Sequence, residues 1–305
     1  MMKDITTEYN PLPERTAVAL GVFDGVHLGH RLVIDRAVSL SGEGLGSAVF
    51  TFRSDTVVNK GSERLLTDAE KLRRISQRRV DYVCSPSFDE MRDMTAEDFV
   101  RRVLAGRLNC RYAVCGKDFR FGKGTQGNAE LLARLGEEYG FEAIVLDKLA
   151  LRGETVSSTV IKEHIRQGEL LRANELLGYR FGYREPVIHG SELGRKWGFP
   201  TVNQLLPRGV TVPRFGVYCS SVKAEGRTYT GVTNIGVKPT VGNASVPLAE
   251  TYIIGFNGDL YGKTVRVGLE RFIRPEQKFS SEEELRRQIA RDTEEAARSD
   301  LAING

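Results

Sequence analysis

A pair of histidines after the first apolar run is the strongest candidate for phosphate chemistry. The segment from Gly21 to His30 reads GVFDGVHLGH and leads directly into a helical pattern. His27 and His30 are three residues apart, so both imidazoles lie on one side of the first helical turn. The free N–H groups and positive dipole end of that turn favour phosphate, and two imidazole donors add to this. The segment therefore predicts a cradle for a triphosphate.

A second candidate for phosphate chemistry lies in the C-terminal half. Thr201 and Asn203 are spaced by two, so in an extended strand their oxygens point the same way and can hold one Mg²⁺ ion or one phosphate. The preceding glycines and cations would surround a polyphosphate with N–H groups and positive charge. From spacing alone, a series of β-turns explains this segment equally well. Its members are Gly190, Gly194, Arg195, Lys196 and Gly198.

The elements that position the histidines alternate between strands and helices. Capping boxes open two of the helices, at Thr67 with Glu70 and at Thr95 with Asp98. Strand-helix alternation predicts a parallel sheet covered by helices on both faces, with ligands at the carboxyl ends of the strands. Short apolar runs mark the strands at 17–22, 47–50, 81–84, 112–115 and 143–146, with helical spacing between them at 33–38 and 99–104.

After about residue 180 the pattern changes to short alternating stretches punctuated by glycines. This predicts a small antiparallel barrel, closed by a helix that begins at a capping box of Ser281 and Glu284. We therefore expect two domains, residues 1–180 and 181–305. The length of 305 residues agrees with two domains of ordinary size.

Composition excludes several classes of protein. The 44 basic and 40 acidic side chains give a net charge of +4, too small for a nucleic-acid coat, and no apolar run is long enough to cross a bilayer. The cluster of Arg73, Arg74, Arg78 and Arg79 is interpreted as the solvated face of a helix. Four cysteines without a CxxC pair predict reduced core thiols. We expect a cytoplasmic protein without nucleic-acid or membrane partners, and leave its oligomeric state open.

The HxGH pattern at 27–30 resembles the signature of the nucleotidyltransferases, which transfer AMP from ATP and release pyrophosphate. The whole GVFDGVHLGH segment resembles the bacterial bifunctional riboflavin kinase/FMN adenylyltransferases, also called FAD synthetases. The resemblance implies a Rossmann-like α/β nucleotidyltransferase domain of the HxGH type. Its ATP-binding residues would be Gly21, Phe23, Asp24, Gly25, His27 and His30, the two histidines being catalytic.

Two further segments of this half resemble the same family. The stretch VSSTVIK at 156–162 resembles a second ATP-binding element, which implies that Ser158, Thr159 and Lys162 contact phosphate; the two hydroxyl residues can equally cap a helix. The stretch GKDFRFG at 116–122 resembles the family's GxDFxFG loop, in which Asp118 meets the nucleotide.

The C-terminal half resembles the riboflavin-kinase signature, because GRKWGFPTVN at 194–203 is close to GRxxGFPTxN. The resemblance implies that Gly190, Gly194, Arg195, Gly198, Thr201 and Asn203 bind ATP, with Thr201 and Asn203 as metal ligands. Similar segments continue to about residue 297, so the resemblance covers nearly the whole chain.

Phosphorylation of riboflavin needs a carboxylate that orients or accepts the proton of its 5′-hydroxyl, together with a metal on the phosphates. Glu250 and Glu270 are the candidates. Glu270 lies on the polar face of an alternating strand, where a charge is usually solvated. Glu250 begins a run that leads into apolar residues, and it matches the catalytic Glu of the family. We therefore predict Glu250.

The resemblance predicts that the C-terminal domain makes FMN from riboflavin and ATP, and that the N-terminal domain makes FAD from FMN and ATP. Both reactions need a divalent metal, and Mg²⁺ is the expected one. Two alternatives remain open. Lys162 in place of the usual Arg, and TFRSDT at 51–56 in place of TFxPHP, would suit a kinase with a weak or inactive transferase half. A non-catalytic flavin sensor is the other.

Overall fold

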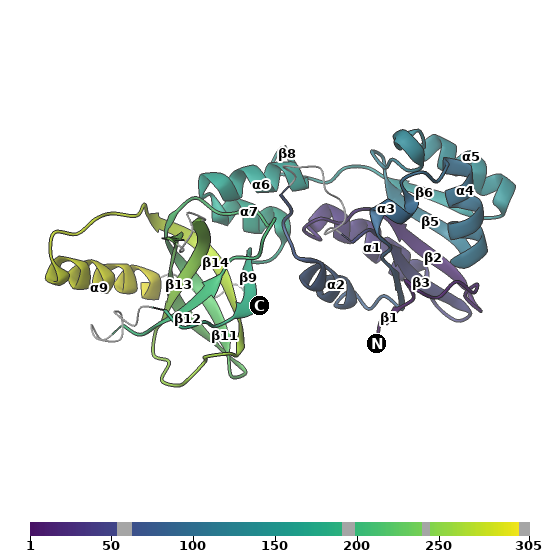
Figure 1. Cartoon of the computed structure of the whole chain (residues 1–305). Coiled ribbons are helices and arrows are strands. Elements are labelled where there is room, and N and C mark those ends of the chain that lie inside the picture. The colour runs from purple at the N-terminus through teal and green to yellow at the C-terminus, as the bar shows by residue number, and fades with distance from the viewer. Residues whose placement is uncertain (54–62, 191–198, 240–244, 299–305) are drawn as a thin grey trace. The chain divides into compact units, whose positions relative to one another are not determined.

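The computed structural model describes residues 1–53, 63–190, 199–239 and 245–298. The chain forms two compact units, Met1–Ser158 and Thr159–Gly305 (Figure 1). Among the described helices, none has the length and apolarity that a membrane crossing requires.

A six-stranded parallel sheet forms the first unit, in the order β1-β4-β3-β2-β5-β6. From central β2 the chain moves outward to β3 and β4 on one side, and then to β5 and β6 on the other. This reversal creates a switch point beyond the carboxyl ends of β2 and β5, where such sheets bind ligands. The predicted Rossmann-like sheet is confirmed. Its strands are β1 (Lys3–Asp4), β2 (Arg15–Leu20), β3 (Leu45–Phe50), β4 (Tyr82–Cys84), β5 (Cys110–Gly116) and β6 (Glu142–Leu146).

Helices cover both faces of this sheet. Val18 and Leu20 of β2 share a core cluster with Phe99 and Leu132, whereas the alternate residues Ala17 and Ala19 are buried on the face that α1 covers. The helices are α1 (Leu28–Leu40), α2 (Asp68–Ser76), α3 (Phe88–Met91), α4 (Ala96–Asp98), η1 (Phe99–Arg107), η2 (Lys123–Thr125) and α5 (Ala129–Tyr139); a small hairpin, β7 (Ala150–Leu151) and β8 (Glu154–Thr155), follows β6.

The predicted helix starts are confirmed. The hydroxyl of Thr67 accepts a hydrogen bond from the N–H of Glu70 (3.3 Å), and the hydroxyl of Thr95 accepts one from the N–H of Asp98 (3.0 Å). The helix expected over 99–104 is a π-helix, η1, rather than an α-helix. Hydrogen bonds from i+5 to i bring residues four and five apart onto one face, which suits the apolar spacing found there.

The second unit is an antiparallel sheet in the order β10-β13-β12-β11-β14-β9. It curls until its two edges nearly meet: the N–H of Ile188 donates to the carbonyl of Asn203 (2.8 Å), and the Gln204 amide donates to the carbonyls of Glu185 and Val265 (2.6 and 2.9 Å). The predicted barrel is confirmed. Its strands are β9 (Gly182–Pro186), β10 (Thr201–Leu205), β11 (Gly216–Ala224), β12 (Arg227–Pro239), β13 (Ser245–Ile253) and β14 (Thr264–Arg274).

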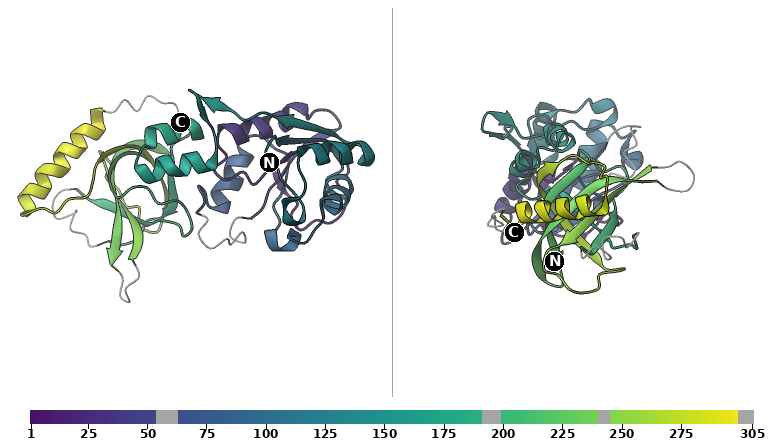
Figure 2. Two further views of the ribbon diagram at one scale, coloured as in Figure 1. Left: turned by 90° about the horizontal axis from the view of Figure 1, so that it is seen from above. Right: turned by 90° about the vertical axis from the view of Figure 1, so that its left-hand side faces the viewer.

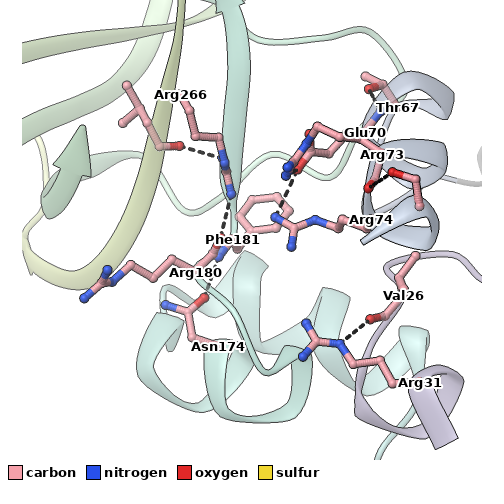
Figure 3. Close-up of polar contacts among 12 residues, drawn as sticks. Val26, Arg31, Thr67, Glu70, Arg73, Arg74, Asn174, Arg180, Phe181 and Arg266 are labelled. Atoms are coloured by element: carbon pink, nitrogen blue, oxygen red, sulfur yellow. Dashed lines mark hydrogen bonds and ion pairs between the residues drawn. The ribbon is translucent and has the colours of Figure 1, made fainter. Parts of the chain in front are cut away.

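Two helices that precede the barrel, α6 (Ser158–Gln167) and α7 (Leu170–Leu177), group with it rather than with the parallel sheet. The Asn174 side chain of α7 donates to the carbonyl of Leu269 in β14 (2.9 Å). It also accepts a hydrogen bond from the N–H of Phe181 (2.7 Å) (Figure 3). The compact division thus falls at residue 158, whereas the sequence analysis places the domain boundary at 180. Helical periodicity alone does not tell which sheet buries the helix.

The closing helix α9 (Glu282–Arg298) lies across one face of the barrel (Figure 2). Ala296 packs against Val217 and Val232 of the strands beneath it. The Arg274 guanidinium of β14 binds the buried carboxylate of Asp292 at 2.8 Å. Apolar packing, this buried ion pair and a more exposed pair of Arg271 with Glu295 at 2.7 Å therefore attach α9 to the barrel.

Two interpretations of charged residues are corrected. Glu270 is buried rather than solvated, because a bulge in β14 turns its carboxylate toward Arg180, 2.7 Å away. On α2, Arg74 is buried and shares the Glu70 carboxylate with Arg73, at 3.0 and 2.7 Å (Figure 3). Only part of this arginine cluster is thus a solvated face.

Candidate active sites

The two histidines of the first unit lie together at the start of α1, beyond the end of β2. His27 is the N-cap, and its Nδ1 accepts a hydrogen bond from the N–H of His30 at 3.2 Å. The imidazole rings stack, with centroids 3.5 Å apart and planes 18° apart. Because Nδ1 of His27 accepts, the neutral ring carries its proton on Nε2 and offers it as a donor.

Both imidazoles are neutral at pH 7. Burial lowers the pKa of His27 to about 4, against a smaller opposing effect of Asp118. The pKa of His30 is also well below its ordinary value, because the ring is buried and because His27 and Lys71 are nearby. The pair can therefore offer hydrogen bonds but little positive charge.

The turn that leads into α1 has an unusual backbone. Phe23, Gly25 and Val26 all have positive φ, at 53°, 90° and 40°. A Cβ on Gly25 would lie 2.6 Å from the Leu65 side chain. Both the positive φ and the lack of space therefore disfavour any residue other than glycine at this position. The Phe23 ring is buried against His30, with centroids 5.4 Å apart. Backbone strain of this kind is typical of functional turns.

Asp24 connects this turn to two other segments. Its carboxylate accepts a hydrogen bond from the N–H of Leu65 (2.7 Å), and its carbonyl accepts one from the hydroxyl of Ser158 (2.7 Å). Two predicted ATP-binding residues, Asp24 and Ser158, are thus brought together. The other two residues of that element, Thr159 and Lys162, lie on α6 in the second unit.

The end of β5 supplies the remaining predicted residue. Asp118 follows this strand, is exposed, and forms an ion pair with Lys148 (3.1 Å). Its charge opposes the lowering of the His27 pKa by burial, so it lies within electrostatic range of that imidazole. The ends of β2 and β5 therefore carry the predicted groups, as the switch point requires.

The sequence analysis missed Lys71. This lysine of α2 is 1% exposed; its ammonium group binds the carbonyl of Phe52 and lies 3.3 Å from the Asp68 carboxylate. Burial lowers its pKa, and its charge acts on His30. It is a cation near the neutral histidines. A lysine in an amphipathic helix gives no sequence signal of burial.

The barrel contains a cavity of about 610 Å³ on the face that α9 covers. Asn203 of β10 pairs directly with Glu250 of β13, which pairs with Asn234 of β12. Paired residues of neighbouring antiparallel strands point to the same face, and all three line the cavity. Thr201 lines the same cavity, two residues before Asn203. The predicted carboxylate and the predicted metal ligands are therefore neighbours.

Asn203, Glu250 and Asn234 form a row across three strands, and the oxygen atoms at the Asn203 end of this row suit a hard cation. Asn203 is 5% exposed, and its Oδ1 has no hydrogen-bond partner among the described residues. A Cβ on Gly190 would lie 2.4 Å from the Asn203 amide, so a glycine is needed there. Hydroxyl and amide oxygens are ligands that Mg²⁺ accepts. Gly194, Arg195 and Gly198 lie outside the described residues.

The sequence analysis also missed much of the cavity wall. Asn234 and Glu276 contribute polar groups, Arg274 and Asp292 contribute the buried ion pair, and α9 adds apolar surface. These residues are distant in sequence, and only the barrel brings them to one face. The apolar lining includes Phe199, Val217, Val232, Tyr252, Phe256, Phe279, Leu285 and Ile289.

A parallel sheet with paired histidines at its switch point, followed by a barrel with a carboxylate beside hydroxyl and amide oxygens, fits a two-domain transferase acting on phosphate compounds. Comparisons with known proteins give the family. The FAD synthetase family model matches residues 10–160, and the riboflavin kinase family model matches residues 177–299. The chain belongs to the bacterial bifunctional riboflavin kinase/FMN adenylyltransferases.

Relatives with that name match nearly the whole chain. The Escherichia coli (strain K12) enzyme is 38% identical over 92% of this chain and 91% of its own length. The Bacillus subtilis (strain 168) enzyme is 34% identical over 93% of this chain and 92% of its own. A crystal structure described as a macrolide-efflux protein from Streptococcus pneumoniae has a TM-score of 0.86 at 28% identity, covering 97% of this chain and 99% of that one.

Proposed function

We propose that the second unit phosphorylates riboflavin to FMN at Glu250, and that the first unit joins FMN to AMP from ATP beside His27 and His30, which gives FAD and pyrophosphate. Membership in the bifunctional family supports both reactions. The observation that carries the kinase assignment is the direct pairing of Glu250 with Asn203 in the cavity of the barrel.

In the kinase reaction, the 5′-hydroxyl of riboflavin attacks the γ-phosphorus of ATP. A P–O bond forms to the hydroxyl oxygen, the bond to the bridging oxygen of ADP breaks, and Glu250 accepts the hydroxyl proton. Thr201 and Asn203 would hold Mg²⁺, which neutralises charge on the β- and γ-phosphates. The polyphosphate is proposed to be surrounded by Gly190, Gly194, Arg195 and Gly198.

In the transferase reaction, a phosphate oxygen of FMN attacks the α-phosphorus of ATP and pyrophosphate leaves. FMN is already an anion, so no general base is needed; orientation and stabilisation of charge carry the catalysis. His27 donates from Nε2. Gly21, Phe23, Asp24 and Gly25 are proposed to form the turn that faces ATP, while Asp118, Ser158, Thr159 and Lys162 complete the ATP site.

A time course separates the two activities. The full chain is incubated with riboflavin and MgATP, and flavins are resolved by chromatography; FMN is expected first and FAD later. Incubation with FMN and MgATP, with pyrophosphate detection, then tests the first unit alone. Formation of FMN without FAD would support an inactive transferase half, and binding without turnover would support a flavin sensor.

We propose residues 1–180 and 181–305 as the functional domains, with α6 and α7 structurally attached to the barrel. The family models, which leave residues 161–176 between them, support a boundary in this region. A fragment that starts at 159 should be more stable than one that starts at 184, because Leu170, Leu176 and Phe181 are buried in this unit. Limited proteolysis compares the two.

We also propose a cytoplasmic location, where ATP is available. The four cysteines, all buried and free, support a reducing compartment. Fractionation of cells with an antibody to the chain tests this.

A further inference from the structure

We propose that Asn234 binds a hydroxyl group on the side chain of the flavin substrate beside Glu250, and that Glu276 positions Asn234 for this contact. The inference rests on the proposed kinase function of the second unit and extends it to a residue that determines substrate specificity.

The position of Asn234 follows from the strand register. Glu250 of β13 has Asn203 as its partner on one side and Asn234 as its partner on the other. All three residues line the cavity. Glu250 therefore lies between two carboxamides, one beside the proposed metal ligand Thr201 and the other on the opposite side.

A hydrogen bond fixes the orientation of the Asn234 amide. Its Nδ2 donates to Oε1 of Glu276 at 3.2 Å. A carboxylate accepts but does not donate, so the amide nitrogen must face Glu276. The Oδ1 atom then points elsewhere; it is buried and has no hydrogen-bond partner among the described residues. An acceptor in this state costs free energy unless a donor from a ligand or water reaches it.

The backbone of β12 leaves room for this arrangement. A Cβ on Gly236, two residues after Asn234, would lie 2.4 Å from Oε1 of Glu276. The glycine thus allows the Glu276 carboxylate to lie over the strand and reach the Asn234 amide. On the side of Asn234 away from Glu250, the strand register continues through Val217 to Arg274, whose charge is matched by Asp292 at 2.8 Å.

The buried Oδ1 of Asn234 suits a hydroxyl donor better than a metal ion. Neighbouring strands are about 4.8 Å apart, so the backbones at Asn203 and Asn234, which β13 separates, are about 10 Å apart. Thr201 lies on β10 with Asn203, so the proposed metal ligands gather on the other side of Glu250 from Asn234. The alcohol substrate must approach Glu250 with its hydroxyl groups, and Asn234 is the acceptor beside that carboxylate. The ribityl chain of riboflavin carries several such donors.

The test compares two flavins in the kinase assay of the full chain. Riboflavin has the ribityl chain, whereas lumiflavin has a methyl group in its place and is tested as a competitive inhibitor. The Asn234→Ala variant should raise KM for riboflavin about tenfold or more, while Ki for lumiflavin and KM for ATP change less than twofold. Glu276→Ala should show the same selective change at smaller size. Glu276→Gln should keep KM for riboflavin near the wild-type value, because the glutamine oxygen can accept the same hydrogen bond.

Thr228→Ala is the matched control, since Thr228 is an exposed residue of the same strand that does not line the cavity. Equal loss of riboflavin and lumiflavin affinity in Asn234→Ala would mean a structural role, and an increase in KM for ATP alone would assign Asn234 to the nucleotide. Either result, or no change, overturns the inference. If the wild-type chain does not phosphorylate riboflavin, the proposed function fails; an unchanged Kd for riboflavin by equilibrium dialysis of Asn234→Ala then overturns the inference separately.

Discussion

Asn203 and Glu250 are direct partners across β10 and β13, and both side chains line the same cavity. This pairing brings a proposed metal ligand and a proposed proton acceptor to adjacent positions, although they lie far apart in the sequence. The five strands that carry the cavity residues hold the two side chains in fixed relation, as positioned catalysis requires.

Glu250→Gln should lower the riboflavin kinase rate by about 100-fold or more, because the amide cannot accept the hydroxyl proton. Formation of FAD from supplied FMN should stay within twofold of the wild-type rate. Glu225→Gln is the control, since Glu225 is an exposed carboxylate of the same unit that pairs with Lys263 on the surface. A kinase rate near that of wild type in Glu250→Gln would exclude Glu250 as the proton acceptor.

Gly25→Ala should impair FAD formation far more than backbone strain alone would. Gly25 and Gly44 both have positive φ, at 90° and 77°, so alanine costs each of them about 1 kcal/mol. Only at Gly25 would the new Cβ meet a side chain, 2.6 Å from Leu65, in the turn before His27. Steady-state rates with FMN and ATP should therefore fall at least tenfold in Gly25→Ala and little in Gly44→Ala. Equal effects would contradict a role for this turn in the site.

The stability of α1 should depend on pH through His27. Its pKa is about 4 in the folded chain and 6.5 ordinarily, so the unfolded chain binds more protons between these values. The contribution of the neutral imidazole is fully present above pH 6.5 and is lost as pH falls toward 4. His27→Asn keeps a side-chain cap that cannot be protonated.

Hydrogen exchange of α1 amides, corrected for intrinsic rates, measures this dependence at pH 7, 6 and 5. The fall in protection should be smaller in His27→Asn than in wild type, though still present because the pKa of His30 is also lowered. Amides of α5 serve as the internal control. An identical pH dependence of α1 in both proteins would show that His27 is not the titrating group.

Asp292→Ala should destabilise the barrel by about 3 kcal/mol and reduce kinase activity. Asp292 is 3% exposed in its side chain and binds Arg274 at 2.8 Å, so its loss leaves a buried, unmatched cation and loosens α9 over the cavity. Glu295→Ala on the same helix removes a surface pair with Arg271 and should cost at most about 1 kcal/mol. Urea unfolding of the two variants makes the comparison; equal midpoints would refute the attachment of α9 through Asp292.

Local sequence patterns predicted the elements of both units well. The strands expected at 17–22 and 143–146 correspond to β2 and β6, and the closing helix expected from Ser281 is α9. These predictions succeed because the period of the apolar residues and the chemistry of a helix cap depend only on neighbours along the chain. The residue types at His27, Thr201 and Glu250 likewise led to the chemistry proposed for them, which stays a prediction.

The tertiary structure decided what distant segments do to one another. Glu270 is buried because a bulge in β14 turns its carboxylate toward Arg180. Lys71 is buried because α2 places its ammonium group against the carbonyl of Phe52, just after β3. The neutrality of His27 arises from burial, and the row from Asn203 to Asn234 exists only through strand register. Burial, charge state and cross-strand partners depend on which surfaces come together in space, and that information is not local to any stretch of the sequence.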